Sequence, residues 1–385
     1  MDKTSPAGLY IHIPFCLRKC PYCDFYSQTD LSLIPAYIKA LLTEMRLGRS
    51  KQRPFAPFFD TLYLGGGTPS LLNSAQLAEI ISTAFSLFSF ASDPEITIEV
   101  NPGALTSVSL GEVRSIGINR INIGVQSFDD SMLCFLGRIH TSREARAAIS
   151  AARDAGFDNI GIDLIYALPG QSLRDWLGDL DQAMAYAPEH ISCYMLTIEP
   201  KTLFGKRQRE GKICAMPDEA VADFFYTTSE YLKRKGYSYY EISNFAREKR
   251  IESRHNKKYW SHAPYLGLGA SAHSFNEPMR WWNHKSLNRY INDLECGKLP
   301  IAGDEALDAS ALLLEHISLG LRTTDGISIE KIRGRFDIDL AEHCKDVILG
   351  LEDKGLIEID SSRCILTHKG RIYCDSIALQ FAYRL

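Results

Sequence analysis

The 385-residue sequence predicts an α/β protein made of a six-stranded partial (β/α) barrel and a small C-terminal winged-helix-like domain. Three observations lead to this fold class. Short β-rich runs alternate with helical segments over residues 8–197, and polar residues fall at or near the C-terminal ends of those runs. Residues 307–367 then read as helices followed by a hairpin.

The alternating part contains six β-rich runs that we predict to be strands. They are Gly8–Ile13, Thr61–Leu64, Ile96–Val100, Arg120–Val125, Asn159–Ile165 and Ile191–Thr197. The helical segments between them are Ile34–Met45, Ser74–Phe85, Leu110–Ile116, Ser142–Ala155 and Ser172–Ala185. Two helices begin at suitable N-cap residues, which are Asn73 or Ser74 and Thr141 or Ser142. This alternation is typical of βαβ units in a parallel sheet with right-handed crossovers.

Periodicity alone permits either an open doubly wound sheet or a partial barrel. The positions of the polar residues favour the barrel, because the working groups of barrels sit at the C-terminal ends of the strands. Gly65–Thr68, Glu99, Gln126 and Asp163 all lie at or near such ends.

The pattern changes after about residue 200. An amphipathic helix over Ala220–Lys235 ends at Gly236, and residues 237–300 are rich in Tyr, Trp, His and Asn with little periodicity. A helical run begins at Leu307, and the remaining predicted elements are helices Ile329–Arg335 and Leu340–Lys354 and strands Leu356–Asp360 and Arg363–Thr367. We therefore expect a barrel domain over 1–236, a connecting region over 237–300 and a C-terminal domain over 301–385.

The composition is that of an ordinary globular protein, with 45% hydrophobic and 23% charged residues. It excludes a disordered chain, a collagen-like repeat and a polytopic membrane protein. The net charge is −4 overall, and it is also −4 over residues 305–385, so the winged-helix-like part lacks the basic face of a DNA reader. We expect a cytoplasmic protein, monomer or dimer, with no secretory signal in Met1–Gly8, no membrane span and no nucleic-acid partner. Transient contact with a membrane stays open.

Three of the ten cysteines are grouped just after the first strand, at Cys16, Cys20 and Cys23. The other seven show no ligand spacing, and we expect most of them to be small buried side chains; they are Cys134, Cys193, Cys214, Cys296, Cys344, Cys364 and Cys374. Three thiolates in one loop suit either zinc or an iron–sulfur cluster. Structural zinc takes four ligands, and the nearest extra candidate, His12, lies inside a strand pattern. A four-iron cluster held at three irons is the better fit, and zinc remains the alternative.

These motifs resemble the radical S-adenosylmethionine (SAM) superfamily. Residues 10–16 read Tyr-Ile-His-Ile-Pro-Phe-Cys and residues 20–23 read Cys-Pro-Tyr-Cys, which is similar to its coproporphyrinogen III oxidase-like branch. The resemblance implies a radical SAM barrel with a [4Fe-4S] cluster on Cys16, Cys20 and Cys23. The open iron of that cluster would chelate S-adenosyl-L-methionine, and one electron would cleave it to a 5′-deoxyadenosyl radical.

The same resemblance implies a set of SAM-binding residues. Gly66, Gly67 and Thr68 belong to a glycine motif after the second strand, and Glu99 could accept hydrogen bonds from ligand amines or hydroxyls. The other positions implied are Tyr10, Tyr22, Gln126, Arg138, Asp163 and Thr197. Catalytic residues are not identified.

A further motif distinguishes two kinds of protein within this branch, the heme chaperones and the dehydrogenases. His255-Asn256-Lys257-Lys258-Tyr259-Trp260 matches the H-N-x-x-Y-W motif of the heme chaperones within this branch. The match implies heme as cargo and apo-hemoproteins as recipients. His255 is a candidate iron ligand, and Asn256, Tyr259 and Trp260 are candidate heme contacts. The alternative is that the motif caps the barrel structurally.

The residues that follow the third cysteine support the same subfamily. The dehydrogenases of the branch carry a further Cys two residues past the third one, where this chain has Phe25 after Asp24. We therefore expect no coproporphyrinogen III dehydrogenase activity. Two alternatives stay open, which are that oxygen-independent dehydrogenase and a zinc-stabilised regulator that binds DNA through its C-terminal domain.

Overall fold

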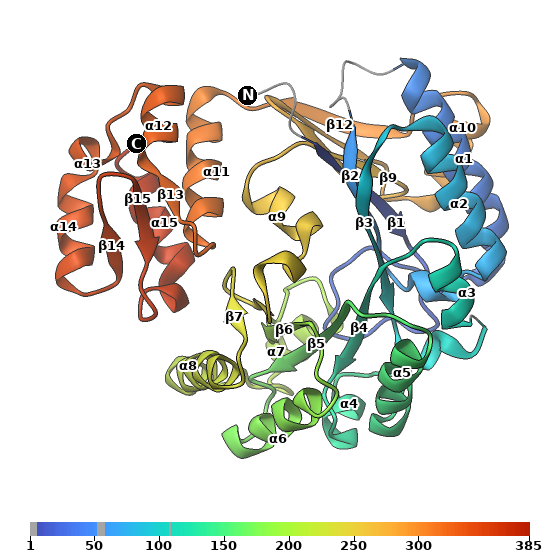
Figure 1. Ribbon diagram of the computed structural model, residues 1–385, viewed down its shortest axis with the longest axis horizontal. Helices are drawn as coiled ribbons and strands as arrows, with labels where there is room; N and C mark the ends of the chain where they lie inside the picture. Colours follow the sequence, from blue (N-terminus) through green and yellow to red (C-terminus); the bar gives the residue numbers. More distant parts are fainter. Residues whose placement is uncertain (1–5, 52–57, 108) are drawn as a thin grey trace.

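The structure is a computed structural model that describes residues 6–51, 58–107 and 109–385 (Figure 1). Most of the segment on which the missing secretory signal was predicted, residues 1–5, lies outside the described residues. The main body is one large sheet of twelve strands in the order β12-β11-β10-β9-β1-β2-β3-β4-β5-β6-β8-β7. Outer helices cover this sheet, and a small separate domain follows it along the chain.

Six parallel strands form the centre of the sheet and confirm the predicted α/β class. They are β1 (Ala7–Ile13), β2 (Phe59–Gly66), β3 (Phe90–Val100), β4 (Arg120–Gln126), β5 (Ile160–Tyr166) and β6 (His190–Met195). Each strand pairs with its neighbour in sequence, which is the order of a barrel, whereas a doubly wound sheet reverses its order in the middle. The sheet does not close, because further strands occupy both edges, so the barrel is partial.

Helices α1 to α6 follow strands β1 to β5 along the chain and form the outer layer seen at the right and bottom of Figure 1. Their bounds are α1 (Ile34–Lys51), α2 (Ser74–Leu87), α3 (Leu110–Ser115), α4 (Asp130–Phe135), α5 (Ser142–Asp154) and α6 (Leu173–Met184). Asn73 and Thr141 are the N-caps of α2 and α5, each with a complete capping box, as the sequence predicted. Helix α4 has six residues and was not predicted from the sequence.

Residues 203–306 form further helices and strands. Of these, only α8 was predicted from the sequence. The helices are α7 (Leu203–Arg209), α8 (Asp218–Arg234), α9 (Arg254–Trp260) and α10 (Leu287–Glu295). The strands are β7 (Ser238–Tyr239), β8 (Asn244–Ala246), β9 (Tyr265–Leu268), β10 (His273–Asn276), β11 (Met279–Asn283) and β12 (Ile301–Ala306). These strands have two to six residues, which is too short for a clear alternation of polar and apolar side chains. They extend both edges of the large sheet.

The C-terminal domain has its own hydrophobic core, separate from the core of the large sheet. It contains α11 (Ala309–Leu321), β13 (Ile327–Ser328), α12 (Ile329–Phe336), α13 (Leu340–His343), α14 (Lys345–Asp353), β14 (Ile357–Ile359), β15 (Arg363–Leu366) and α15 (Cys374–Ala382). The predicted hairpin is β14–β15, and β13 completes a three-stranded antiparallel sheet. Short 3₁₀ helices lie at Leu31–Leu33, Pro69–Leu71, Pro102–Ser107, Lys249–Ile251 and Arg371–Tyr373.

The seven scattered cysteines divide between core and surface. Four of them are buried, as the sequence predicted for most: Cys193, Cys344, Cys364 and Cys374. Cys134, Cys214 and Cys296 are exposed.

Candidate functional site

The three grouped cysteines lie in a loop that follows β1. The loop is closed at its base, where the Cys16 backbone N–H donates to the Gln28 carbonyl at 2.9 Å. Within the loop, the Cys23 N–H donates to the Cys20 carbonyl at 3.1 Å. All three thiols are free of disulfides and line one cavity of about 710 Å³. The loop thus wraps around a common space, as three ligands of one metal centre require.

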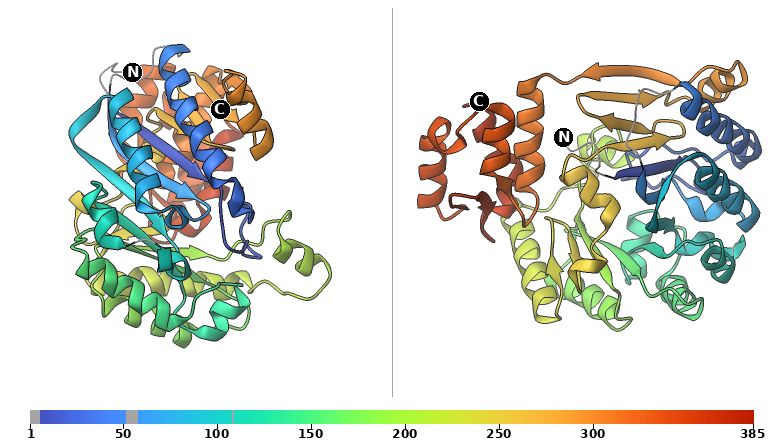
Figure 2. Two further views of the ribbon diagram at one scale, coloured as in Figure 1. Left: turned by 90° about the vertical axis from the view of Figure 1, so that its right-hand side faces the viewer. Right: turned by 45° about the horizontal axis from the view of Figure 1, so that its top comes forward.

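The cavity lies at the C-terminal ends and inner face of β1 to β6. Besides the three cysteines, it is lined by nine of the ten residues that the resemblance assigned to SAM: Tyr22, Gly66, Gly67, Thr68, Glu99, Gln126, Arg138, Asp163 and Thr197. Tyr10 does not line it; its hydroxyl bonds His12 Nδ1 at 2.9 Å, and its ring lies beside Tyr63. Helix α7 contacts the outer side of the cysteine loop, since Phe204 N–H donates to the Pro21 carbonyl (Figure 2).

The glycine motif ends β2 directly against the start of the cysteine loop. A side chain at Gly67 would meet backbone atoms of Ile13 and Phe15 at 2.7–2.8 Å, so only glycine fits there. The Gly67 N–H also donates to the Ile13 carbonyl at 2.8 Å. The motif therefore positions the two residues that lead into Cys16. Thr68 continues this contact, because its hydroxyl lies 3.5 Å from the Cys16 sulfur.

Glu99 is held beneath the glycine motif. Its Oε1 accepts from the Tyr63 hydroxyl at 2.9 Å, and its Oε2 accepts from the Gly66 N–H at 3.0 Å. Burial raises the pKa of Glu99 to about 7, and the two hydrogen bonds oppose that rise. A cationic or hydroxyl-bearing ligand in the cavity would stabilise the ionised carboxylate.

Arg138 connects the cysteine loop to β4. Its Nη1 lies 3.6 Å from the Cys20 sulfur and 3.5 Å from the Tyr22 hydroxyl, and its Nη2 donates to the Gly124 carbonyl at 2.9 Å. A fixed cation beside a sulfur stabilises negative charge on that sulfur. Burial raises the pKa of the neighbouring Cys23 thiol to about 11, so in the absence of metal this thiol stays protonated at neutral pH.

The strands opposite the cysteine loop supply polar groups. Asp163 accepts from Asn122 Nδ2 at 2.5 Å, and burial raises the pKa of Asp163. Gln126 ends β4 with φ of 71°, a left-handed conformation that non-glycine residues rarely adopt and that tends to cluster at functional sites. Asn122 Oδ1, Asp163 Oδ1 and Arg138 Nε are buried and have no hydrogen-bond partner within the described chain. Such unpaired groups around a cavity fit a polar ligand, and three free thiols on the same cavity fit an iron–sulfur cluster.

Sequence reasoning missed several lining residues on the same strands. Arg120, Asn122 and Gly124 lie at alternate positions of β4 before the predicted Gln126, and His190, Ser192 and Tyr194 lie at alternate positions of β6; all of them line the cavity. The signal was present as polar residues at every second position of otherwise apolar runs. Arg18, Asp24, Phe25, Ser27 and Glu199 also line the cavity and lie in loops without such a signal.

The H-N-x-x-Y-W motif forms the short helix α9, which lies between two cavities. Asn256 lines the cysteine cavity, whereas Trp260 lines a larger cleft next to the C-terminal domain. His255 faces neither: it is 1% exposed, its Nδ1 bonds the Thr61 hydroxyl at 2.8 Å, and its Nε2 bonds the Tyr259 hydroxyl at 3.0 Å. Both ring nitrogens that could bind iron are thus occupied by hydrogen bonds.

Comparisons with known proteins agree with this site. Residues 10–183 match the radical SAM superfamily profile, and residues 307–373 match the HemN C-terminal domain. The structure of Escherichia coli coproporphyrinogen III oxidase (HemN), described as a radical SAM enzyme, aligns with a TM-score of 0.85 over 100% of this chain and 91% of that one. Its identity of 24% makes this a likeness of fold. Fold and profile together define a radical SAM protein of the HemN-like branch.

Similar curated proteins identify the family within this branch. The chain is 35% identical to the heme chaperone HemW of Mycobacterium tuberculosis over 377 residues, which cover 97% of this chain and 94% of that protein. It is 34% identical to the Bacillus subtilis HemW over 94% of this chain and 96% of that one, and 40% identical to the Escherichia coli HemW over 71% of each. The chain belongs to the HemW family. Among the described helices, none has the length and apolar character needed to cross a bilayer.

Proposed function

We propose that this protein is a cytoplasmic heme chaperone, which binds heme and passes it to apo-hemoproteins. The observation that carries the proposal is the 35% identity to proteins named heme chaperone HemW along 97% of the chain. The absence of a cysteine two residues after Cys23, where Phe25 stands, agrees with a chaperone and not with a dehydrogenase of the branch.

We propose further that Cys16, Cys20 and Cys23 hold a [4Fe-4S] cluster and that S-adenosyl-L-methionine binds in the cavity beside it. When bound, the two groups supply one-electron chemistry at the sulfonium of SAM. Support for the cluster comes from three free thiols on one cavity wall and from the Arg138 guanidinium beside the Cys20 sulfur. In this arrangement Arg138 holds negative charge on the sulfur ligand.

The remaining residues of the cavity would bind and orient SAM. Gly66 and Gly67 line the cavity, and Glu99 is placed to accept from an amine or a hydroxyl. The unpaired oxygen of Asp163 offers a second acceptor, and Gln126 and Thr197 lie on the same wall. Binding of a cation near Glu99 would lower the pKa of that carboxyl from about 7.

The experiment that tests the proposal is heme transfer. The purified protein is loaded with heme, passed through gel filtration, and mixed with an apo-hemoprotein whose Soret band differs from that of the loaded protein. A chaperone retains heme through the column and yields the acceptor's Soret band. Loss of all heme on the column would contradict the proposal.

The alternative function is oxygen-independent coproporphyrinogen III dehydrogenase, which the shared radical SAM fold favours. Anaerobic incubation with coproporphyrinogen III, a reductant and SAM separates the two. Formation of protoporphyrinogen above a cluster-free Cys20→Ala control would favour the dehydrogenase. No product above that control is expected for the chaperone.

A further inference from the structure

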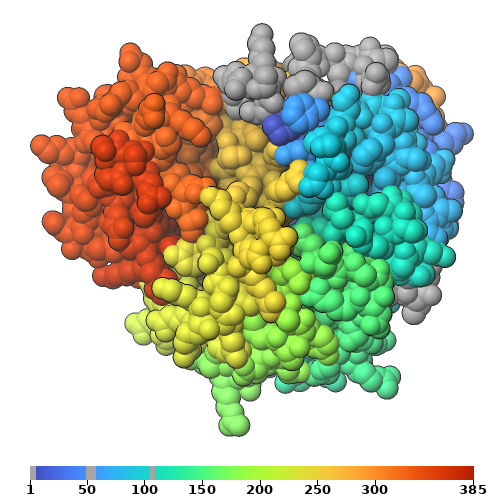
Figure 3. All heavy atoms as spheres, viewed as in Figure 1, coloured from blue at the N-terminus to red at the C-terminus, as the bar shows by residue number. Residues whose placement is uncertain are grey.

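A second cavity, larger than the cysteine cavity, lies apart from it. It is a cleft of about 1340 Å³ between the C-terminal domain and the region that contains α9, and Figure 3 shows the surface hollowed where these two parts meet. One wall comes from α11, α12 and the turn before β13, and the other comes from α9 and the segments on either side of it. This volume exceeds that of pockets for drug-sized ligands, which is about 300–1,000 Å³.

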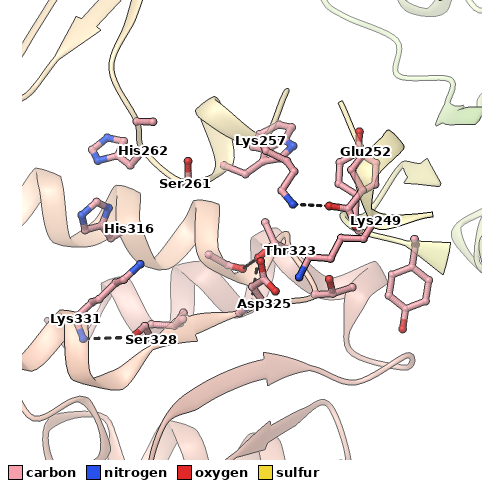
Figure 4. A pocket seen from close by; sticks show the side chains of 18 of the residues that line it. Lys249, Glu252, Lys257, Ser261, His262, His316, Thr323, Asp325, Ser328 and Lys331 are labelled. Carbon is pink, nitrogen blue, oxygen red and sulfur yellow. Dashed lines mark hydrogen bonds and ion pairs between the residues drawn. The ribbon is translucent and has the colours of Figure 1, made fainter. Parts of the chain in front are cut away.

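Two histidines lie together at one end of this cleft (Figure 4). His262 follows α9 and His316 is on α11, and their ring centroids are 4.6 Å apart in an edge-to-face contact. The Nε2 of His262 bonds Glu315 at 2.7 Å, and Arg280 in turn bonds both oxygens of Glu315 at 2.6 Å. His262 also has φ of 55°, a conformation retained only where the surroundings fix it.

His316 is the more accessible of the two rings. It lines the cleft, and neither of its ring nitrogens has a hydrogen-bond partner within the described residues. An imidazole nitrogen without an internal hydrogen bond can offer its lone pair to a metal.

The cleft carries positive charge in an acidic chain. Six Lys and Arg side chains line it against four Asp and Glu side chains, although the whole chain has a net charge of −4. The ammonium groups of Lys249 and Lys331 have no ion pair or hydrogen bond within the described part of the chain, and Figure 4 shows them on the cleft wall. Trp260 adds an aromatic surface to the same cleft. An iron-binding imidazole, an aromatic wall and unpaired cations suit a flat, dianionic metalloporphyrin.

We propose that heme binds in this cleft with His316 as the protein ligand of its iron and with Lys249 and Lys331 facing its propionates. The inference rests on the proposed chaperone function and gives the cargo a site. His262, fixed by Glu315, orients the His316 ring by its edge-on contact. His255 instead connects α9 to β2 through its bond with Thr61, and α9 presents Trp260 to the heme and Asn256 to the cysteine cavity.

The test is a titration of the full-length protein with ferric heme, followed at the Soret band. Four proteins are compared: the unaltered chain, His316→Ala, His255→Ala and the control His343→Ala, whose ring is exposed on α13 outside the cleft. His316→Ala should weaken heme binding about tenfold or more and shift the Soret band, because it removes an iron ligand. His343→Ala should leave both unchanged, and His255→Ala should keep the Soret position of the unaltered protein.

Added imidazole should restore the original Soret position in His316→Ala if that side chain ligates iron. A second variant, His316→Gln, keeps the side-chain volume and replaces the first if the alanine variant fails to fold by circular dichroism. An unchanged spectrum and affinity in the folded His316 variant would overturn the cleft site, and the chaperone function would still stand if the unaltered protein binds and transfers heme. Failure of the unaltered protein to bind heme would instead overturn the proposed function.

A bare metal ion is the competing occupant at this end of the cleft. His262, His316 and Glu277 can bring one ligand atom each to within 4.8 Å of one another. To distinguish a bare metal ion from heme, the same four proteins are titrated with Co²⁺ alone, and binding is followed by visible absorption. If His316→Ala abolishes Co²⁺ binding and leaves heme binding intact, these three side chains bind a metal ion and the heme proposal is wrong.

Discussion

Replacement of Gly67 by alanine tests how the glycine motif holds the cysteine loop. The added methyl carbon would lie 2.7 Å from the carbonyl oxygens of Ile13 and Phe15 and 2.8 Å from the Phe15 nitrogen. These atoms belong to the backbone, so they cannot rotate away as a side chain would. Each contact would have to lengthen by about 0.7–0.8 Å to reach an ordinary separation of about 3.5 Å. The strand end that leads into Cys16 would therefore shift.

Overpacking of this kind costs roughly 1–3 kcal/mol of unfolding free energy. The main body has roughly 300 residues and thus an unfolding entropy of about 0.6 kcal/mol/K, so this cost corresponds to a fall in Tm of about 2–5 °C. We also expect less iron per protein after cluster reconstitution. The matched control is Gly178→Ala in α6, where an added methyl meets nothing within 4 Å, so it should stabilise the helix by about 0.5–1 kcal/mol. Equal Tm and equal iron content in Gly67→Ala and the unaltered protein would refute this account of the motif.

Three further variants test other parts of the structure. Burial raises the pKa of Glu44 to about 7, so the native state binds more protons than the unfolded chain above pH 4.5. The contribution of Glu44 to the free energy of unfolding should then fall as pH rises from 5 to 8. Glu44→Gln should remove this contribution and change the slope of unfolding free energy against pH by up to about 1.4 kcal/mol per pH unit in urea titrations; equal slopes would contradict it. Thr141→Ala removes the capping box of α5 and should cost about 1 kcal/mol in the same assay. Arg138→Gln removes the cation 3.6 Å from the Cys20 sulfur and should lower the reduction potential of the cluster by about 60 mV, the equivalent of about 1.4 kcal/mol, with an unchanged potential excluding that role.

The barrel could be predicted because each of its elements has a local signal. The six central strands are apolar runs, and Asn73 and Thr141 mark helix starts by residue type alone. The strand order also follows from the chain, since consecutive βαβ units place neighbours side by side. The strands of residues 237–300 could not be predicted because they are short and gain stability by pairing with the edges of the barrel sheet. Such pairing partners are far away in the sequence.

The cysteine site was predictable and the environment of the histidine motif was not. Spacing alone groups Cys16, Cys20 and Cys23, and nine of the SAM-binding candidates lie on the same cavity. The motif at His255 is equally clear in sequence, but the direction of one side chain depends on how α9 docks. Glu95 accepts from the first backbone N–H groups of α9, and this docking turns His255 into the sheet. Only the tertiary structure shows that the ring is enclosed.

The proposed chemistry of the cavity depends on an iron–sulfur cluster held by Cys16, Cys20 and Cys23, with one iron open to SAM. The most direct measurement is the electron paramagnetic resonance spectrum of the reduced, anaerobically prepared protein before and after SAM is added, together with its iron and labile sulfide content. We predict labile sulfide in the unaltered protein, none in a variant with Cys16, Cys20 and Cys23 replaced by alanine, and a change of g values when SAM binds. A protein without labile sulfide would contradict the proposed cluster. A cluster whose spectrum does not change when SAM is added would contradict the open iron site.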